Sequence, residues 1–347
     1  MRASAAHLAK TRTELPDTGA DAPNPVTALL DLAAPDMAAV DALIRERLDS
    51  PVGVIPDLAG HLVGAGGKRL RPLLTVVAAQ LCGGSTVAHH KLAASVEFIH
   101  SATLLHDDVV DQSALRRGRK TANRIWGNAS SILVGDFLFA RAFNLMVETG
   151  SLEALDILAK ASSVIAEGEV AQLASLRNVA LDEDTYLGVI GAKTAALFAA
   201  ACEVSPVVSE RPKAERDALK TYGHAIGMAF QLVDDALDYG GLSTALGKSV
   251  GDDFREGKLT LPVIRALKAA EPEETAFWQR VMGELDQTDV DLERAVSYLR
   301  RADALGSTLA AATDYAESAK TALDVFGESE WVELLRALAD YVVARRS

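Results

Sequence analysis

Apolar residues recur at intervals of three and four along almost the whole chain. The segments "LEALDILAKASSVIAEGEVAQLASL" and "LLRALADYVVARR" show the pattern clearly, and no run of alternating β-branched residues stands out. A period near 3.6 is typical of amphipathic helices, whereas strands alternate with a period of two. The sequence therefore predicts an all-α protein without a sheet.

Short breaks separate the helical segments. They fall at Pro51 and at stretches such as "GAGGK", "SPVVSERP" and "YGGLSTALG", after each of which the helical pattern resumes. We therefore expect a flexible arm over residues 1–32 and a single domain over residues 33–347, a bundle of roughly a dozen helices. Two long helices are predicted at about 89–113 and 213–239.

Composition narrows the classes of function. Of 347 residues, 49% are hydrophobic, which suffices for a large core, and the net charge is −13. Such an acidic chain is unsuited to nucleic acid, whose phosphates require a basic surface. Cys82 and Cys202 give no disulfide framework, and no charge-free apolar stretch reaches about 18 residues. We therefore expect a cytoplasmic protein with no transmembrane segment and no nucleic-acid partner.

The two long helices carry two copies of one acidic pattern. "LLHDDVVD" and "FQLVDDALD" each hold three aspartates beside apolar residues. One such cluster alone is more often a solvated acidic face. Two clusters on helices with apolar sides must both pack inward, where facing carboxylates are costly unless cations neutralise them. Oxygen-only ligands suit Mg²⁺, which takes further ligands from water and substrate phosphates. The six carboxylates are Asp107, Asp108, Asp111, Asp234, Asp235 and Asp238.

Small basic groups interrupt this acidic chain. In "GGKRLRP", the glycines let the backbone come close to an anion, and Lys with Arg offers a point charge and a bidentate fork for phosphate. Each group alone is more often solvated charge than a ligand. Together with two metal-type clusters, they predict a cavity for two polyphosphate groups, one held through Mg²⁺ and one held directly. The candidate side chains are Lys68, Arg69, Arg71, His100, Arg116, Arg117, Lys193, Thr194, Lys248 and Lys258.

The order of motifs resembles that of the trans-prenyltransferases, or polyprenyl diphosphate synthases, over nearly all of residues 35–345. The motifs are "GGKRLRP", "EFIHSATLLHDDVVD", "LRRG", "GNASSILVGDFL", "EGEVAQL", "KTAALF", "FQLVDDALD" and "GKSVGDDFREGKLTLP". The resemblance implies an isoprenoid synthase fold around a deep central cavity, dependence on Mg²⁺ and a homodimer. It also implies head-to-tail condensation of isopentenyl diphosphate with an allylic diphosphate, farnesyl or geranylgeranyl diphosphate.

The resemblance also implies roles for single residues. Asp107, Asp108, Asp111, Asp234 and Asp238 would ligate Mg²⁺ on the allylic diphosphate, and Asp235 would belong to the same catalytic group. Arg116, Lys193 and Lys258 would hold that diphosphate, with Lys248 as a further substrate-binding residue. Lys68, Arg71, His100 and Arg117 would hold isopentenyl diphosphate, and Thr194 and Gln231 would lie beside the developing cation. Gly191, just ahead of "AKT", is less usual but is not a proposed ligand.

The residues expected to set product length are small in this sequence. Ala102 and Thr103 lie about one helical turn, roughly 5.4 Å, below the first aspartates. Short-chain members of the family place an aromatic residue there, so we expect an open tunnel. Together with "VEFIHSATLLHDDVVD" and "VIAEGEVAQLA", this most resembles the long-chain synthases that make octaprenyl to decaprenyl diphosphate for the ubiquinone side chain. The tunnel would pass Phe98 or Ile99, then Ser95, towards Phe137 or Phe139. The alternative is that both residues are small only to let helices pack closely.

Four other functions are weighed against this one. A geranylgeranyl diphosphate synthase would differ in product length alone. A class I terpene cyclase would not need a second diphosphate site at Lys68, Arg71 and His100. A non-catalytic subunit of a heteromeric synthase is disfavoured by two complete acidic motifs. A purely structural helical protein leaves the basic groups unexplained.

Overall fold

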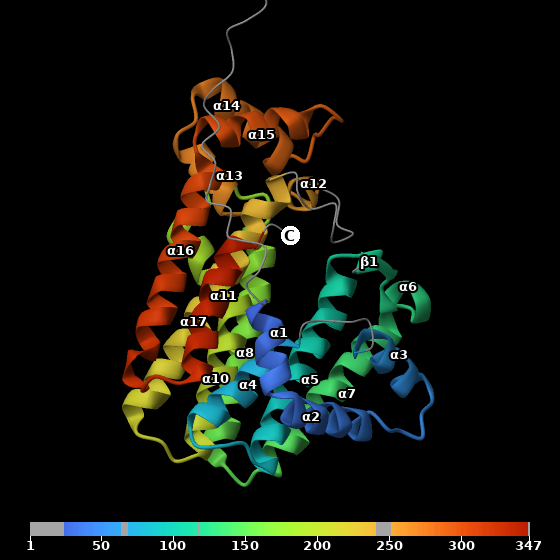
Figure 1. Ribbon diagram of the computed structural model, residues 1–347. Helices are drawn as coiled ribbons and strands as arrows, with labels where there is room; N and C mark the ends of the chain where they lie inside the picture. Colours follow the sequence, from blue (N-terminus) through green and yellow to red (C-terminus); the bar gives the residue numbers. More distant parts are fainter. Residues whose placement is uncertain (1–23, 64–68, 117, 241–250, 346–347) are drawn as a thin grey trace, which may run out of the picture.

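The computed structural model describes residues 24–63, 69–116, 118–240 and 251–345 (Figure 1). Nearly all of them are helical, so the all-α prediction is confirmed. The first elements are α1 (Pro25–Leu32), α2 (Ala34–Arg47), α3 (Val54–Val63), α4 (Leu70–Leu81), α5 (Val87–Val110), β1 (Leu115–Arg116), β2 (Arg119–Lys120), α6 (Ala122–Trp126), α7 (Asn128–Val147) and α8 (Leu152–Ser175). The others are α9 (Glu183–Ile190), the π-helical turn η1 (Gly191–Ala195), α10 (Ala196–Val208), α11 (Lys213–Tyr239), α12 (Asp252–Glu256), α13 (Leu261–Lys268), α14 (Pro272–Trp278), η3 (Gln279–Gly283), α15 (Asp291–Arg301), α16 (Ala304–Ala322), η4 (Leu323–Val325) and α17 (Glu330–Ala344).

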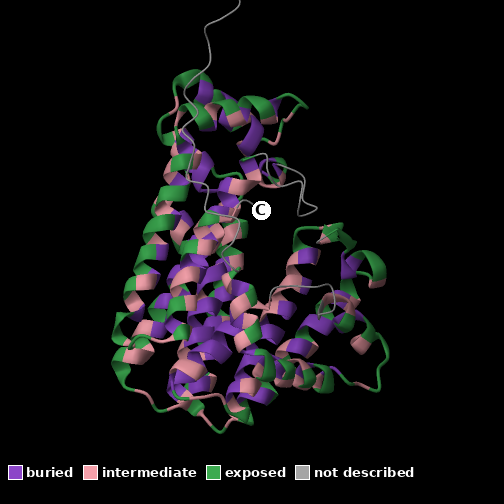
Figure 2. Cartoon of the chain, viewed as in Figure 1, coloured by how far each residue is buried: buried purple, intermediate pink, exposed green. Residues whose placement is uncertain are grey.

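Two long helices, α5 and α11, carry the acidic motifs and match the helices predicted at 89–113 and 213–239. α5 packs along α7, and α11 lies between α10 and α16. α11 also joins two hydrophobic cores, since Tyr222 and Ile226 belong to the larger one, and Leu232 and Val233 to the smaller one. Buried residues fill the space between the long helices (Figure 2). The motif at the end of α11 is therefore fixed by packing on several sides.

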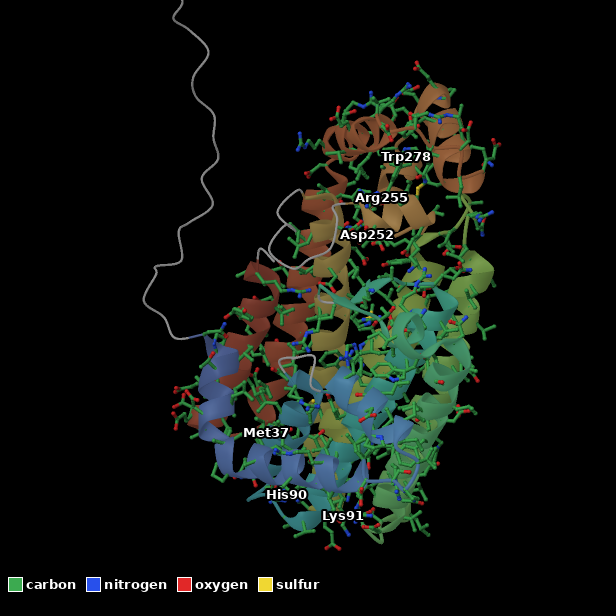
Figure 3. The ribbon with its side chains drawn as sticks, turned by 90° about the vertical axis from the view of Figure 1, so that its right-hand side faces the viewer. Met37, His90, Lys91, Asp252, Arg255 and Trp278 are labelled. Carbon is green, nitrogen blue, oxygen red and sulfur yellow. The ribbon has the colours of Figure 1, made fainter. Side chains whose placement is uncertain are left out.

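The two ends of the molecule are held by different contacts. Trp278, at the end opposite His90 (Figure 3), is fully buried in the smaller core, and its ring meets that of Phe277 edge-on at 5.3 Å. At the other end, Asp36 of α2 lies 2.8 Å from His90 Nε2 of α5 and accepts a hydrogen bond of 2.7 Å from Gln80 of α4. These polar contacts tie α2, α4 and α5 together beneath the larger core.

Three details differ from the sequence-based prediction. A two-stranded antiparallel ribbon, β1 with β2, pairs Arg116 with Arg119 and is too short to show alternation in sequence. The arm was expected to reach residue 32, but α1 already begins at Pro25, its N-cap Asn24 accepts from Val26 N at 2.9 Å, and Leu29 is fully buried. Short helices such as α6 and α12 raise the number of helices in the described residues above the expected dozen.

Two helical stretches are long and apolar enough to cross a membrane by length and composition alone. They are Asn128–Val147 and Glu183–Val208, with 39% and 61% of their apolar windows buried inside the protein. The first packs on α5, and the second, which covers α9, η1 and α10, packs on α11. Core helices of a globular fold pass the same test, so neither stretch is a clear membrane span.

Candidate active site

Both acidic motifs lie at the C-terminal ends of their helices. α5 ends at Val110 with Asp111 as its C-cap, and α11 ends at Tyr239, directly after Asp238. The C-terminal end of a helix dipole carries partial negative charge, which disfavours carboxylates. Three aspartates at each of these ends therefore need cations or hydrogen-bond donors from elsewhere in the chain.

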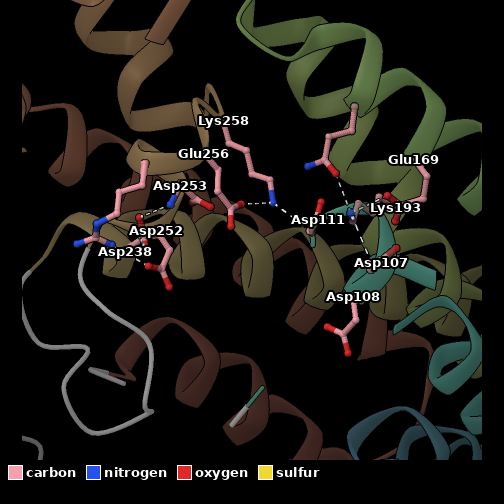
Figure 4. A network of polar contacts seen from close by, with 12 residues as sticks. Asp107, Asp108, Asp111, Glu169, Lys193, Asp238, Asp252, Asp253, Glu256 and Lys258 are labelled. Carbon is pink, nitrogen blue, oxygen red and sulfur yellow. Dashed lines mark hydrogen bonds and ion pairs between the residues drawn. The ribbon is translucent and has the colours of Figure 1, made fainter. Parts of the chain in front are cut away.

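Lysines from two distant segments meet the first motif (Figure 4). Lys193 Nζ lies 3.8 Å from Asp107 Oδ2, and Lys258 Nζ lies 3.3 Å from Asp111 Oδ2. Asp107 and Asp111 are four residues apart and so share one helix face. The structure thus brings two predicted phosphate-binding lysines to two predicted metal ligands.

Asp108 points elsewhere and is only 1% exposed. Arg116 of β1 donates to Asp108 Oδ1 from Nε at 3.0 Å and lies 2.9 Å away through Nη2. The amide of Asn123 donates to the backbone oxygen of Asp108 at 2.9 Å. Asp108 therefore anchors the β1–β2 ribbon and holds Arg116 at the edge of the site.

Lys193 is positioned by α8 as well as by the first motif. Its Nζ donates to Glu169 Oε2 and to Gln172 Oε1, both at 2.7 Å. Both side chains belong to the motif "EGEVAQL", for which no role was predicted, although its i, i+3 spacing places them on one helix face. Burial raises the pKa of Asp107 to about 7, against the opposing effect of Lys193.

Asp234, in the second motif, forms an ion pair with Arg345, close to the C-terminus. Arg345 Nη2 donates to Asp234 Oδ1 at 2.5 Å and to the backbone oxygen of Phe230 at 2.7 Å. The guanidinium lies 4.0 Å from the ring centre of Phe230, and the Arg345 side chain is 9% exposed. The C-terminal end of α17 therefore contributes a cation that sequence reasoning did not identify.

Asp238 organises the segment after the second motif. Its two carboxylate oxygens accept from the backbone N–H groups of Asp252 at 3.2 Å and Asp253 at 3.1 Å, so it caps the N-terminus of α12. Lys258 N in turn donates to Asp253 O at 2.9 Å. In this way the second motif places Lys258, which faces Asp111 of the first.

Asp235 lies beneath the site, 1% exposed, in a chain of hydrogen bonds. It accepts from the Tyr186 hydroxyl of α9 and, at 3.0 Å, from Gln231 Nε2. Gln231 Oε1 accepts from Thr194 Oγ1 at 3.1 Å. Burial raises the pKa of Asp235 to about 7, although both hydrogen bonds lower it. Thr194 and Gln231, predicted to lie beside the cation, are thus in direct contact.

Two glycines on neighbouring helices contact the π-helical turn η1, which carries Lys193 and Thr194. A Cβ added at Gly168 of α8 would lie 2.8 Å from Lys193 N, and one at Gly227 of α11 would lie 2.6 Å from Ala195 Cα. Neither distance is compatible with a side chain unless the backbone moves. π-Helical turns occur often at functional sites. Here α8 and α11 both pack closely against the turn, and each does so at a glycine, which has no side chain to prevent the contact.

The predicted second phosphate site is described in part. Arg71 Nη1 lies 3.2 Å from His100 Nε2, and its guanidinium lies 4.2 Å from the ring centre of Phe198. Arg69 instead has positive φ and ion-pairs with Glu97 at 2.6 Å. The structure therefore brings Arg71 and His100 together as the prediction requires. Lys68, Arg117 and Lys248 lie outside the described residues.

The two predicted chain-length residues of α5 differ in burial, and Thr103 is only partly buried. Ala102 is fully buried, and Thr103 Oγ1 donates to the backbone oxygen of His100 at 2.8 Å. Deeper along α5, the Ser95 hydroxyl lies 3.2 Å from Ala142 O of α7. Complete burial of Ala102 is compatible with a tunnel wall and with close helix packing, so its effect on product length stays a prediction.

The donor set suits Mg²⁺. The predicted ligands are all carboxylate oxygens, and no three His, Cys, Asp or Glu side chains of the described residues converge to form a metal cage. Mg²⁺ usually binds through one or two carboxylates and takes its other ligands from water and substrate phosphates. The predicted ligands therefore fit a metal that binds together with a diphosphate, while each assignment stays a prediction.

Comparison with known proteins decides the family. The model of the polyprenyl synthetase family matches residues 53–299. The chain belongs to this family. As a polyprenyl synthetase it is a prenyltransferase, of a family that generally depends on Mg²⁺, and the resemblance found in the sequence is confirmed.

Several characterised polyprenyl synthetases align with nearly the whole chain. The octaprenyl diphosphate synthase of Escherichia coli (strain K12) is 43% identical over 91% of this chain and 97% of its own. The crystal structure of a decaprenyl diphosphate synthase from Rhodobacter capsulatus has a TM-score of 0.90 and 53% identity, covering 93% of this chain and 100% of that one. A polyprenyl synthase from Caulobacter crescentus CB15, complexed with calcium and isoprenyl diphosphate, has a TM-score of 0.89 and 55% identity, covering 93% and 98%.

Proposed function

We propose that the protein is a long-chain trans-polyprenyl diphosphate synthase. It adds isopentenyl diphosphate head-to-tail to an allylic diphosphate, farnesyl or geranylgeranyl diphosphate, and makes an octaprenyl to decaprenyl product. The observation that carries the proposal is the meeting of Asp107 and Asp111 with Lys193 and Lys258, two lysines from distant segments. The octaprenyl and decaprenyl synthases among its relatives support the long product.

The first chemical step breaks the allylic C–O bond. The protein must stabilise the negative charge that develops on the leaving diphosphate. Mg²⁺ held by Asp107, Asp111, Asp234 and Asp238 would supply Lewis acidity at the leaving diphosphate, whereas Asp108, predicted as a ligand, is buried against Arg116 and positions that arginine. Lys193, Lys258 and Arg116 stabilise the negative charge that grows on its oxygens. Because that charge is larger in the transition state than in the ground state, fixed cations accelerate the reaction instead of only tightening binding.

The second step joins the two substrates. Thr194 and Gln231 direct oxygen lone pairs towards the allylic cation. Arg71 and His100, with Lys68 and Arg117, hold isopentenyl diphosphate so that its double bond attacks the cation. The proton then lost passes to the departed diphosphate. No protein nucleophile is required, and the site depends on orientation and electrostatics.

The proposed assembly is a homodimer in the cytoplasm. Apolar side chains on the outer faces of α7 and α8 are more than half exposed, namely Leu133, Val147, Leu152 and Val170. α7 and α8 contact each other in the fold, and the proposal is that a second copy covers these exposed apolar side chains. We expect sedimentation at the mass of a dimer, and Val170→Asp to shift the equilibrium towards monomer. A monomeric wild-type protein at micromolar concentration would contradict the assembly.

One assay tests the activity and the product together. Purified protein is incubated with Mg²⁺, labelled isopentenyl diphosphate and farnesyl diphosphate, and the dephosphorylated products are resolved by length. A ladder ending at eight to ten isoprene units is expected for the ubiquinone side chain. An end at four units would identify a geranylgeranyl diphosphate synthase. No product from folded protein would point to a subunit that needs a partner.

A further inference from the structure

We propose that Tyr186 is a positioning residue for the cation-stabilising pair Thr194 and Gln231. The inference rests on the proposed function and adds a residue that no motif indicated. Tyr186 lies on α9, is 5% exposed, and donates its hydroxyl hydrogen to Asp235 Oδ2. It does not face the first acidic motif but acts through the buried carboxylate beneath the site.

The chemistry of Asp235 sets the direction of the hydrogen bonds. Both carboxylate oxygens of Asp235 act as acceptors, one for the Tyr186 hydroxyl and one for the amide NH₂ group of Gln231. Gln231 Nε2 is 3.0 Å from Asp235 Oδ1, which turns Gln231 Oε1 towards Thr194, 3.1 Å away. The Thr194 hydrogen is thereby committed to Gln231. The remaining oxygen lone pairs of Thr194 and Gln231 are then available to an adjoining positive charge.

Tyr186 keeps this arrangement in place. A carboxylate as buried as Asp235 is costly unless donors satisfy it, and among the described residues its donors are Tyr186 and Gln231. Tyr186 fixes one oxygen, so that the other is presented to Gln231 at a defined angle. If Gln231 turned over, its NH₂ group would face the developing cation and raise the barrier to ionisation.

Tyr186→Phe removes the hydroxyl with almost no change in shape. We expect the single-turnover rate for farnesyl diphosphate plus isopentenyl diphosphate to fall about 10- to 100-fold, as when a residue that orients a metal ligand is lost. The KM of each diphosphate should stay within about twofold, because the phosphate-binding side chains are untouched. The single-turnover rate is used because slow release of a long product can mask the chemical step.

Tyr222→Phe is the matched control. Tyr222 is also fully buried and donates its hydroxyl hydrogen at 2.9 Å to the backbone oxygen of Leu335, away from the site. Both variants should lose similar stability on thermal unfolding, and only Tyr186→Phe should lose rate. As a second variant, Asp235→Asn should also slow the reaction, because an asparagine amide can donate and so lets Gln231 take either orientation.

The outcomes separate this inference from the proposed function. Wild-type protein that makes no prenyl product contradicts the function itself. An active wild type with equal rates in Tyr186→Phe and Tyr222→Phe overturns the positioning role. So does a raised KM with an unchanged single-turnover rate, or a wild-type rate in Asp235→Asn.

Discussion

Gly227 lies where α11 crosses η1. Adding a methyl group at this position tests whether the reaction rate depends on the close contact between α11 and η1. In Gly227→Ala, the new Cβ would lie 2.6 Å from Ala195 Cα and 3.0 Å from Ala195 Cβ. Carbon atoms pack at about 3.5–4.0 Å, so η1 and α11 must separate by about 1 Å. Thr194 and Gln231 are already 3.1 Å apart, and the same movement takes their hydrogen bond beyond its normal range.

The expected effect on rate is larger than the effect on stability. Overpacking usually costs about 1–3 kcal/mol, and alanine regains about 1 kcal/mol over glycine in a helix. Gly227→Ala should therefore lose about 0–2 kcal/mol of unfolding free energy. A displacement of about 1 Å in a catalytic group can reduce the rate about 100-fold. We expect a fall of that order in the single-turnover rate.

Gly188→Ala on α9 provides the control, because a Cβ there meets no atom within 4 Å. It should stabilise the protein by up to about 1 kcal/mol and leave the rate unchanged. Thermal unfolding and the rate of the first condensation are measured for both variants beside wild type. A wild-type rate in Gly227→Ala would refute the idea that close approach of η1 to α11 positions the site.

Three further predictions concern single side chains. Asp107→Ala should lower turnover by orders of magnitude while circular dichroism stays helical, and normal turnover would contradict its role. Ala102→Tyr should shorten the product in the ladder assay, and an unchanged product would show that Ala102 does not line the tunnel. Arg280 holds the pKa of Asp291 well below its ordinary value, so the stability from this pair is present above pH 3.8 and is lost on further acidification. Asp291→Asn should thus destabilise the protein by about 1–3 kcal/mol at pH 7 and flatten the decline in acid, which urea unfolding at several pH values will show.

The sequence predicts those features that depend only on residues close together in the chain. The helices α5 and α11 follow from apolar spacing, and the candidate aspartates and lysines, whose roles stay predictions, follow from unusual residue types in short motifs. Tyr186 and Arg345 did not emerge, because each is an ordinary residue of an amphipathic helix until the fold brings it to an aspartate far along the chain. The start of α1 did carry a local signal, Asn24 followed by Pro25, which is typical of a helix N-terminus.

The ion pairs between acidic and basic residues also determine how the site responds to its ligands. Lys193 and Lys258 neutralise aspartates of the first motif, and Arg345 neutralises Asp234 of the second. A divalent cation alone has to compete with these side chains, and a diphosphate alone has to compete with the carboxylates. When the cation and the diphosphate bind together, the aspartates can pair with the cation and the basic side chains with the diphosphate. By thermodynamic linkage, each ligand must then raise the affinity for the other by the same factor. On the proposed function, the protein would thus select a metal–diphosphate pair as a single unit.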